Sequence, residues 1–209
     1  MSLVAKSDIH AFIQAGGLSS RMGTDKAWLE INGRPMIEHV LAAAQPVAAS
    51  LSIVINSANP NAGRYRELAE KWNARLLHDL HDHKGPLGGI HTALKNCGQG
   101  QAALILACDL PFLTAEFLNF LCQKHLSGNA AITVPTDQEN RLQPLAAIYD
   151  PICLHSVERM IAYDLLRVDG LFVELLTQFI CIDQNKPQVF SKKLFSNLNS
   201  FEDYNRNKV

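Results

Sequence analysis

The sequence predicts one α/β domain, built on a mostly parallel central sheet with helices on both faces. Short apolar runs rich in β-forming residues alternate with helical patterns from Ile9 to His125, which is the order of elements in βαβ units. One run, AALILAC at Ala102–Cys108, is apolar throughout, as expected for a central parallel strand covered on both faces. The 209 residues suffice for one sizeable domain, and no repeat, low-complexity tract or linker divides them.

Each element is placed by its own local pattern. Pro35 is expected in the first turn of a helix with an apolar face, and Thr114 is a suitable N-cap for a later helix. In the first part we expect strands at Ile9–Gln14, Ser52–Asn56, Arg75–His78 and Ala102–Cys108, and helices at Pro35–Gln45, Arg64–Trp72, Leu87–Asn96 and Thr114–His125. The less regular second part favours strands at Ala130–Pro135, Leu145–Tyr149 and Phe179–Asp183, with helices over Pro151–Ala162 and near Gly170–Gln178.

The composition is that of an ordinary globular protein, with 47% hydrophobic and 19% charged residues. Lys and Arg number 19 against 20 Asp and Glu, a formal net charge of -1, which gives no general attraction to nucleic acid or to an anionic membrane. Any bound polyanion must therefore be held by a local site. The N-terminus lacks the apolar core of a signal peptide, and no apolar run is long enough to cross a bilayer. We expect a cytoplasmic protein that binds neither nucleic acid nor membrane.

Two groups of residues deserve consideration as metal ligands. The cysteines, which have no zinc-like spacing, are interpreted as small hydrophobes in a reducing compartment; they are Cys97, Cys108, Cys122, Cys153 and Cys181. Asp79, His81, Asp82 and His83 alternate closely, but they could bind one metal only if their loop folded back on itself. A polar loop beside a ligand is the preferred interpretation.

The carboxyl ends of the strands are where a ligand is expected, because open α/β sheets bind ligands in the crevice beyond those ends. Three segments follow predicted strands: AGGLSSRMGTDK after the first, HDLHDHKGPLGG after the third and DLPFL after the fourth. The first is rich in glycine and basic residues. Gly16 and Gly17 allow close approach of a phosphate chain, and Arg21 and Lys26 supply positive charge.

This opening segment matches neither of two common phosphate motifs. The P-loop pattern fails because Gly17 and Gly23 have the wrong spacing and Thr24 follows Gly23. The dinucleotide pattern G-x-G-x-x-G fails because Gly16 and Gly17 are adjacent, which removes a dehydrogenase from consideration. What remains is A-G-G-x-S-x-R-M-G-x-D-K.

That string resembles the signature of the molybdenum cofactor guanylyltransferases, the MobA family, which reads close to LAGGxSxRMGxDK. This chain has Gln14 where leucine is usual. Further landmarks fall in order along the chain: Gly85-Pro86-Leu87-Gly88-Gly89-Ile90, Cys108-Asp109-Leu110-Pro111-Phe112, Gln143-Pro144-Leu145 and Asn197-Leu198-Asn199. The resemblance covers nearly the whole chain and is most specific up to Leu113. It implies a single Rossmann-like nucleotidyltransferase domain over residues 1–209.

The resemblance also implies roles for individual residues. Arg21, Lys26 and Asp109 are the expected catalytic residues. Asp109 is the expected ligand of Mg²⁺, which suits a carboxylate at a strand end. The expected nucleotide-binding residues are Gln14, Ala15, Gly16, Gly17, Lys26, Asn56, Asp79, Gly85, Asp109 and Asn199. Arg141, just before Gln143-Pro144-Leu145, could meet an acceptor phosphate.

The implied reaction is guanylyl transfer. The terminal phosphate of molybdenum-molybdopterin attacks the α-phosphorus of GTP, with proteins that deliver molybdopterin or mature molybdoenzymes as further partners. Two alternatives stay open. One is transfer of another nucleotide, such as CMP, or transfer to another phosphorylated acceptor; cytidylyl relatives tend to show AAG at Ala15-Gly16-Gly17. The other is a non-catalytic nucleotide-sensing domain, which would not need Arg21, Lys26 and Asp109 together.

Overall fold

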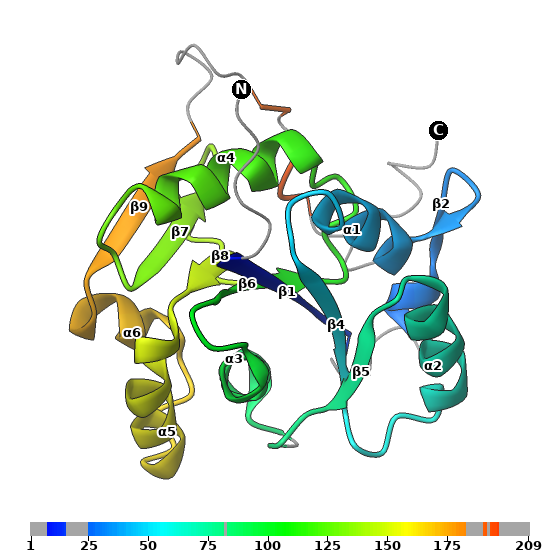
Figure 1. Ribbon diagram of the computed structural model, residues 1–209, viewed down its shortest axis with the longest axis horizontal. Helices are drawn as coiled ribbons and strands as arrows, with labels where there is room; N and C mark the ends of the chain where they lie inside the picture. Colours follow the sequence, from blue (N-terminus) through cyan, green and yellow to red (C-terminus); the bar gives the residue numbers. More distant parts are fainter. Residues whose placement is uncertain (1–7, 16–24, 82, 183–189, 192, 197–209) are drawn as a thin grey trace.

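The computed structural model describes residues 8–15, 25–81, 83–182, 190–191 and 193–196, and Figure 1 shows their arrangement. The described chain contains a seven-stranded sheet with the order β5-β4-β1-β6-β8-β7-β9. Its strands are β1 (Ile9–Gln14), β4 (Ser50–Ile55), β5 (Arg75–His78), β6 (Ala102–Ala107), β7 (Ile132–Thr136), β8 (Ala146–Tyr149) and β9 (Thr177–Cys181).

The sheet is mostly parallel, which confirms the predicted fold class. β1 pairs in parallel with β4 and β6, β4 with β5, and β7 with β9. Only β8, among the described strands of this sheet, runs against its neighbours β6 and β7. Gln14 at the end of β1 lies opposite Val54 and Ala107. The carboxyl ends of the central parallel strands therefore meet at one edge of the sheet.

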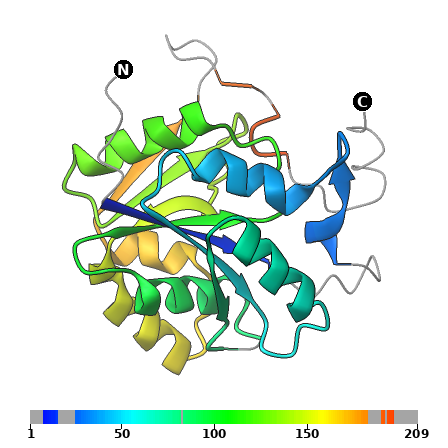
Figure 2. The ribbon, with the colours of Figure 1, turned by 45° about the vertical axis from the view of Figure 1, so that its right-hand side comes forward.

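Helices cover both faces of the sheet, as Figures 1 and 2 show. The helices are α1 (Met36–Ala44), α2 (Ala62–Lys71), α3 (Gly85–Asn96), α4 (Ala115–Leu126), α5 (Leu154–Ala162) and α6 (Asp169–Glu174). Since side chains alternate along a strand, Ala11 and Ile13 of β1 enter the core shared with α1, α2 and α4. Phe12 enters the core shared with α3, α5 and α6.

Local chemistry explains where several helices begin. The Thr114 side chain accepts a hydrogen bond from the Phe117 amide and caps α4, as predicted. Two short 3₁₀ helices, η2 (Lys26–Trp28) and η3 (Pro151–Cys153), are capped in the same way by Asp25 and Asp150. Within the described residues, no helix has the length and apolar character needed to span a membrane.

The segment before α1 differs from the sequence prediction. The pattern predicts Pro35 inside the helix, but Pro35 lies in β3 (Arg34–Pro35), which pairs with β2 (Glu30–Ile31), and α1 begins at Met36. Asn32 and Gly33 join the two strands with φ angles of 51° and 72°. Two consecutive positive φ angles at an Asn-Gly pair are typical of a tight hairpin turn.

The structure also differs from the sequence prediction at β9, the edge strand beside β7. The sequence predicts a helix as far as Gln178, but α6 ends at Glu174 and Gln178 belongs to β9. The segment is drawn into the sheet by parallel pairing with β7, in which Gln178 lies opposite Thr133. The expectation of buried cysteines holds for Cys122 and Cys153, whereas Cys181 is exposed on this strand.

Candidate active site

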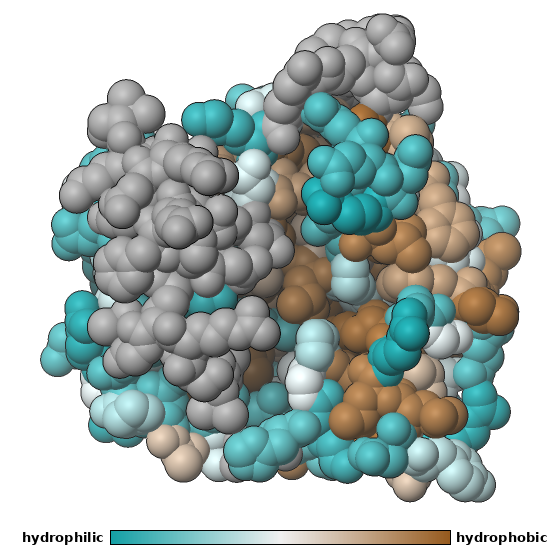
Figure 3. All heavy atoms as spheres, turned by 180° about the vertical axis from the view of Figure 1, so that it is seen from behind, coloured by the Kyte–Doolittle hydropathy of each residue, from teal (hydrophilic) through white to brown (hydrophobic). Residues whose placement is uncertain are grey.

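A cavity of about 470 Å³ lies at the carboxyl ends of β1, β4, β5 and β6. Seen from behind, the molecule is hollowed near the middle, with apolar side chains at the base of the hollow (Figure 3). Seven of the residues predicted from the sequence line this cavity: Gln14, Ala15, Lys26, Asn56, Asp79, Gly85 and Asp109. The other predicted residues, Gly16, Gly17, Arg21 and Asn199, lie outside the described residues.

Backbone hydrogen bonds tie these strand ends together. The Ala15 amide donates to the Val54 carbonyl at 2.8 Å, and the Cys108 amide donates to the Gln14 carbonyl at 3.1 Å. The Asp79 amide continues the pattern with a 2.7 Å bond to the Ile55 carbonyl. The sheet itself therefore sets the spacing of the residues that face the cavity.

Asp109 brings a carboxylate into this cavity, close to Lys26. Burial raises the pKa of the Asp109 carboxyl above its usual value, and the positive charge of Lys26 partly opposes that shift. A desolvated carboxylate is unfavourable unless cations approach it. The cavity thus holds an acidic group that gains from a bound cation and a basic group that suits an anionic ligand.

Asp79 is held in one orientation by its neighbours. Its Oδ1 atom accepts hydrogen bonds from the Thr92 hydroxyl at 2.8 Å and from the His81 amide at 3.1 Å. Thr92 lies on α3, so these bonds link the end of β5 to that helix. The Oδ2 atom of Asp79 lies beside Gly88, where a β-carbon, if the residue had one, would come within 3.4 Å of it.

The start of α3 packs tightly against the end of β1. Gly85 begins the helix with a φ of 59°, a conformation in which a side chain would be strained. Further along, a β-carbon on Gly89 would lie 2.6 Å from Cδ of Gln14. Gly89 therefore leaves room for the Gln14 carboxamide, whose Nε2 atom is buried without a hydrogen-bond partner among the described residues.

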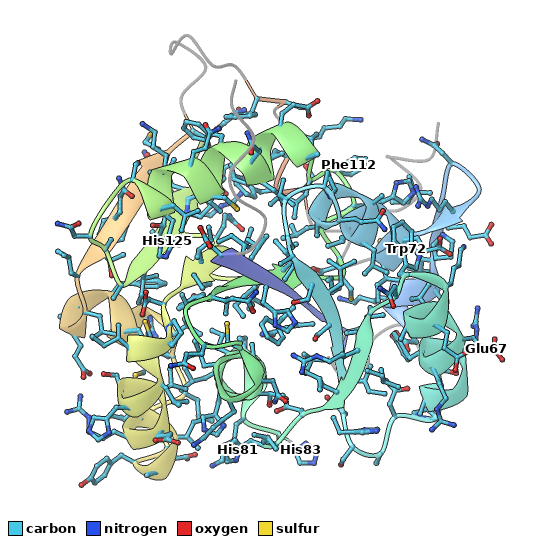
Figure 4. All side chains as sticks on the ribbon, viewed as in Figure 1. Glu67, Trp72, His81, His83, Phe112 and His125 are labelled. Atoms are coloured by element: carbon cyan, nitrogen blue, oxygen red, sulfur yellow. The ribbon has the colours of Figure 1, made fainter. Side chains whose placement is uncertain are left out.

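Asp25 and His83 also line the cavity; the sequence did not single out Asp25, whereas His83 lies in the loop interpreted as a polar loop beside a ligand. Asp25 precedes Lys26, and its signal was its position as a potential cap before the Lys-Ala-Trp run. His83 has a φ of 71° and belongs to the Asp/His-rich loop. Figure 4 shows His81 and His83 near each other beside α3, but the His81 ring packs on His91, 4.8 Å between centroids.

Arg141 does not line the cavity. It is paired with Asp137 at 2.7 Å and with Glu139 at 3.0 Å on an exposed loop. Its guanidinium is thus paired with two carboxylates of its own loop, and its contact with an acceptor phosphate stays a prediction. Leu145, which follows the Gln143-Pro144 pair, does reach the cavity.

Comparison with known proteins places this geometry in a family. Residues 11–170 match the family model of the MobA-like NTP transferase domain. The chain belongs to this family. It is thus a nucleotidyltransferase.

Individual MobA-like proteins resemble this chain along most of their own length. A "Probable molybdenum cofactor guanylyltransferase" of Methanothermobacter thermautotrophicus is 33% identical over 196 residues, which cover 93% of each chain. A molybdenum cofactor guanylyltransferase of Desulfosudis oleivorans is 31% identical and is matched over 80% of its length, which is 82% of this chain. The fold is also that of the molybdopterin-guanine dinucleotide biosynthesis protein A of Archaeoglobus fulgidus, with a TM-score of 0.77, 23% identity and coverage of 95% of this chain and 96% of that one.

NTP transferases of this family generally use a divalent metal ion, and Asp109 fits such an ion. Its carboxylate is a hard oxygen ligand at the end of a buried strand. No three acidic, histidine or cysteine side chains are grouped to hold a metal in the described part of the chain. Mg²⁺ in enzymes that bind nucleotides commonly takes one or two protein carboxylates together with substrate phosphates and water.

Proposed function

We propose that this enzyme transfers GMP from GTP to the terminal phosphate of molybdenum-molybdopterin. A phosphate oxygen of the acceptor forms a bond to the α-phosphorus of GTP. The bond from that phosphorus to the oxygen bridging to the β-phosphate breaks, and its electron pair leaves with pyrophosphate. The products are the guanine dinucleotide form of the molybdenum cofactor and pyrophosphate.

This proposal depends on one observation: Lys26 and Asp109 line the same cavity at the carboxyl ends of the strands. Transfer between phosphates requires alignment and charge neutralisation more than proton transfer, because the attacking oxygen is already an anion. A lysine and a metal-binding carboxylate supply those two needs. The names of the relatives that match over most of this chain support guanine as the base and the molybdenum cofactor as the product.

The proposed roles divide between charge and positioning. Asp109 holds Mg²⁺, which when bound neutralises charge on the triphosphate. Lys26 donates to phosphate oxygens and stabilises the charge that builds up on pyrophosphate as it leaves. Neither role needs a general base, and none is assigned.

The remaining residues are proposed to hold the nucleotide. The strand ends supply Gln14, the backbone of Ala15, Asn56 and Asp79, and Gly85 lets α3 begin close to the ligand. The same proposal gives nucleotide contacts to Gly16, Gly17 and Asn199 and a catalytic role to Arg21, all outside the described residues. We further propose that the reaction takes place in the cytoplasm, with partner proteins that deliver molybdopterin or receive the finished cofactor.

Cytidylyl transfer is the second candidate, and the fold supports it. The 4-diphosphocytidyl-2C-methyl-D-erythritol synthase of Anaerococcus prevotii has this fold with a TM-score of 0.72 at 15% identity, covering 99% of this chain and 96% of that one. Gln14, which lines the cavity, also stands where the MobA signature has leucine.

Isothermal titration calorimetry with GTP, CTP, ATP and UTP, each with Mg²⁺, separates these candidates. Preferential binding of GTP supports guanylyl transfer, and preferential binding of CTP replaces it with cytidylyl transfer. Binding of none of the four contradicts the proposal. Binding without turnover when molybdenum-molybdopterin is added would indicate a nucleotide sensor.

A further inference from the structure

The side chain of Asp25 accepts three hydrogen bonds at the edge of the cavity. Its Oδ1 atom accepts from the Ala27 amide at 3.2 Å, and this bond caps the short helix that carries Lys26. Its Oδ2 atom accepts from the Tyr65 hydroxyl at 2.8 Å and from Nδ2 of Asn61 at 3.2 Å. These three donors fix the residue directly before Lys26.

Tyr65 connects this carboxylate to the end of β1. Its hydroxyl oxygen lies 3.5 Å from the carbonyl oxygen of Ala15 and 2.8 Å from Oδ2 of Asp25. One phenolic proton serves one acceptor at a time, and the shorter distance assigns it to Asp25. Ala15 and Asp25 stand on either side of residues 16–24. The Tyr65 hydroxyl therefore lies between Ala15, which follows β1, and Asp25, which precedes Lys26.

The ring of Tyr65 is rigidly held. Tyr65 is completely buried on the inner face of α2, whereas Glu67, two residues further on, points away from the body of the molecule (Figure 4). The Trp28 ring packs on it at 5.1 Å, and the Arg64 guanidinium covers Trp28 at 4.0 Å. A buried aromatic ring with packed neighbours presents its hydroxyl in one position.

From this geometry we propose that Tyr65 is a positioning residue, which holds Lys26 in the cavity through its hydrogen bond to Asp25. This role of Tyr65 rests on the proposed function, in which Lys26 acts on the triphosphate. Both oxygens of Asp25 already accept hydrogen bonds, so its role is to orient the helix that begins at Lys26.

Tyr65 acts as a hydrogen-bond donor throughout the working pH range. Burial, more than any other influence, raises the pKa of its hydroxyl well above its usual value, and nearby Cys108 and Asp25 raise it further. The phenol therefore stays protonated, and its complete burial keeps it from contact with substrate. A role in proton transfer or as a nucleophile does not fit this environment.

The first test needs no substrate. Tyr65→Phe keeps the ring and removes the hydroxyl. We expect amide hydrogen exchange at Ala27 to quicken by roughly fivefold as Asp25 loses its shortest hydrogen bond. Asn61→Ala removes the weaker, longer bond and should quicken exchange at the same amide by less. Thr133→Val is the matched control, because it deletes a buried hydroxyl bonded to His125 at 2.9 Å in strand β7, away from the cavity.

The second test measures the consequence for catalysis. With the nucleotide that the wild-type enzyme uses, Tyr65→Phe should lower kcat by about 10-fold to 100-fold, while KM for the nucleotide changes much less. Thr133→Val should leave kcat unchanged. In a Lys26→Ala background, Tyr65→Phe should lower kcat by less than about twofold, because residues that act through one group are not additive.

Each result decides the proposal. Unchanged exchange at Ala27 in a folded Tyr65→Phe enzyme overturns it, as does an equal loss of kcat in the wild-type and Lys26→Ala backgrounds. Failure of the proposed function has a different signature. The wild-type enzyme would then not use GTP at all, while the exchange result would still report whether Tyr65 holds Asp25.

Discussion

The carboxamide of Gln14 occupies the space into which any side chain on Gly89 would extend. A β-carbon at Gly89 would lie 2.6 Å from Cδ of Gln14 and 2.7 Å from its two amide heavy atoms. Both residues line the cavity, one from the end of β1 and the other from the second turn of α3. The missing side chain of Gly89 therefore decides where the Gln14 carboxamide lies.

Gly89→Ala should weaken nucleotide binding without harming the fold. The new methyl group displaces the flexible end of Gln14 into the cavity, and we expect the Kd for the nucleotide to rise about tenfold, which corresponds to ~1.4 kcal/mol. Calorimetric titration measures this change. Adding Gln14→Ala to Gly89→Ala removes the displaced group and should recover part of the affinity.

Gly63→Ala is the control for that variant. Gly63 lies in α2, and a β-carbon there meets nothing within 4 Å. Alanine is the better helix former by roughly 0.5–1 kcal/mol, so this variant should be slightly more stable and bind nucleotide as the wild type does. Equal binding by both glycine variants would contradict the role given to Gly89.

Lys26→Ala should lower kcat by about 10²–10³, because it removes a preorganised positive charge from the cavity. The loss should appear in kcat rather than in KM if the charge acts mainly as pyrophosphate leaves. Lys26→Arg keeps the charge and should recover part of the rate. Steady-state kinetics at saturating nucleotide and Mg²⁺ provide the measurement, and near wild-type kcat in the alanine variant would refute the catalytic role.

The stability of the enzyme should fall between pH 6.5 and pH 4 because of His10. Burial, assisted by the charge of Arg75, lowers the pKa of His10 to about 4 from 6.5, and its Nε2 lies 2.9 Å from the Ser52 hydroxyl oxygen. In that window the unfolded chain binds a proton that the folded chain excludes, so stability is lost as the pH falls. The titration of His10 alone should lower the free energy of unfolding by about 2 kcal/mol between pH 7 and pH 5.

Urea unfolding at the two pH values tests this prediction against a His10→Gln variant. The carboxamide can still bond to Ser52 but does not titrate. The variant should therefore lose distinctly less stability than the wild type on acidification. An identical loss of stability in both proteins would show that the pH dependence comes from other groups. His91 and His125 are such groups, because burial also lowers their pKa values.

Much of the cavity could be predicted from the sequence because its residues follow strands. Apolar runs locate the strands, and the parallel order brings their carboxyl ends together, so the pattern predicts that Asp79 and Asp109 lie near one another, and the MobA resemblance adds Asn56. The register of β1 with its neighbours then completes the arrangement. The prediction worked here because local pattern and topology agree.

Other features depend on contacts that no local pattern reveals. The bond between Tyr65 and Asp25 joins residues 40 positions apart, and nothing around Tyr65 distinguishes it from a core aromatic residue. Gln178 is drawn into β9 by pairing with β7, although its neighbourhood reads as helical. The hairpin before α1 had a usable signal in Asn32-Gly33, which was outweighed by the proline that usually opens a helix.

Asp109→Asn should stabilise the fold while it removes activity. Burial raises the pKa of the Asp109 carboxyl, so its ionised form is less favourable in the folded chain than in the unfolded one. At a pH below the usual carboxyl value of about 4 the group is protonated in both states and has no effect. As the pH rises above that value the unfolded chain releases its proton first, and the folded state loses stability.

Asparagine has the same shape but no charge to desolvate. We expect the Tm of this variant at pH 7 to exceed that of the wild type, with the difference vanishing at pH values below about 4. The kcat should fall by at least about 10²-fold, because a neutral carboxamide is a poor ligand for Mg²⁺. Calorimetry across this pH range, paired with kinetics at saturating Mg²⁺, measures both effects. An asparagine variant that is less stable at pH 7 and still active would show that Asp109 serves the fold rather than the reaction.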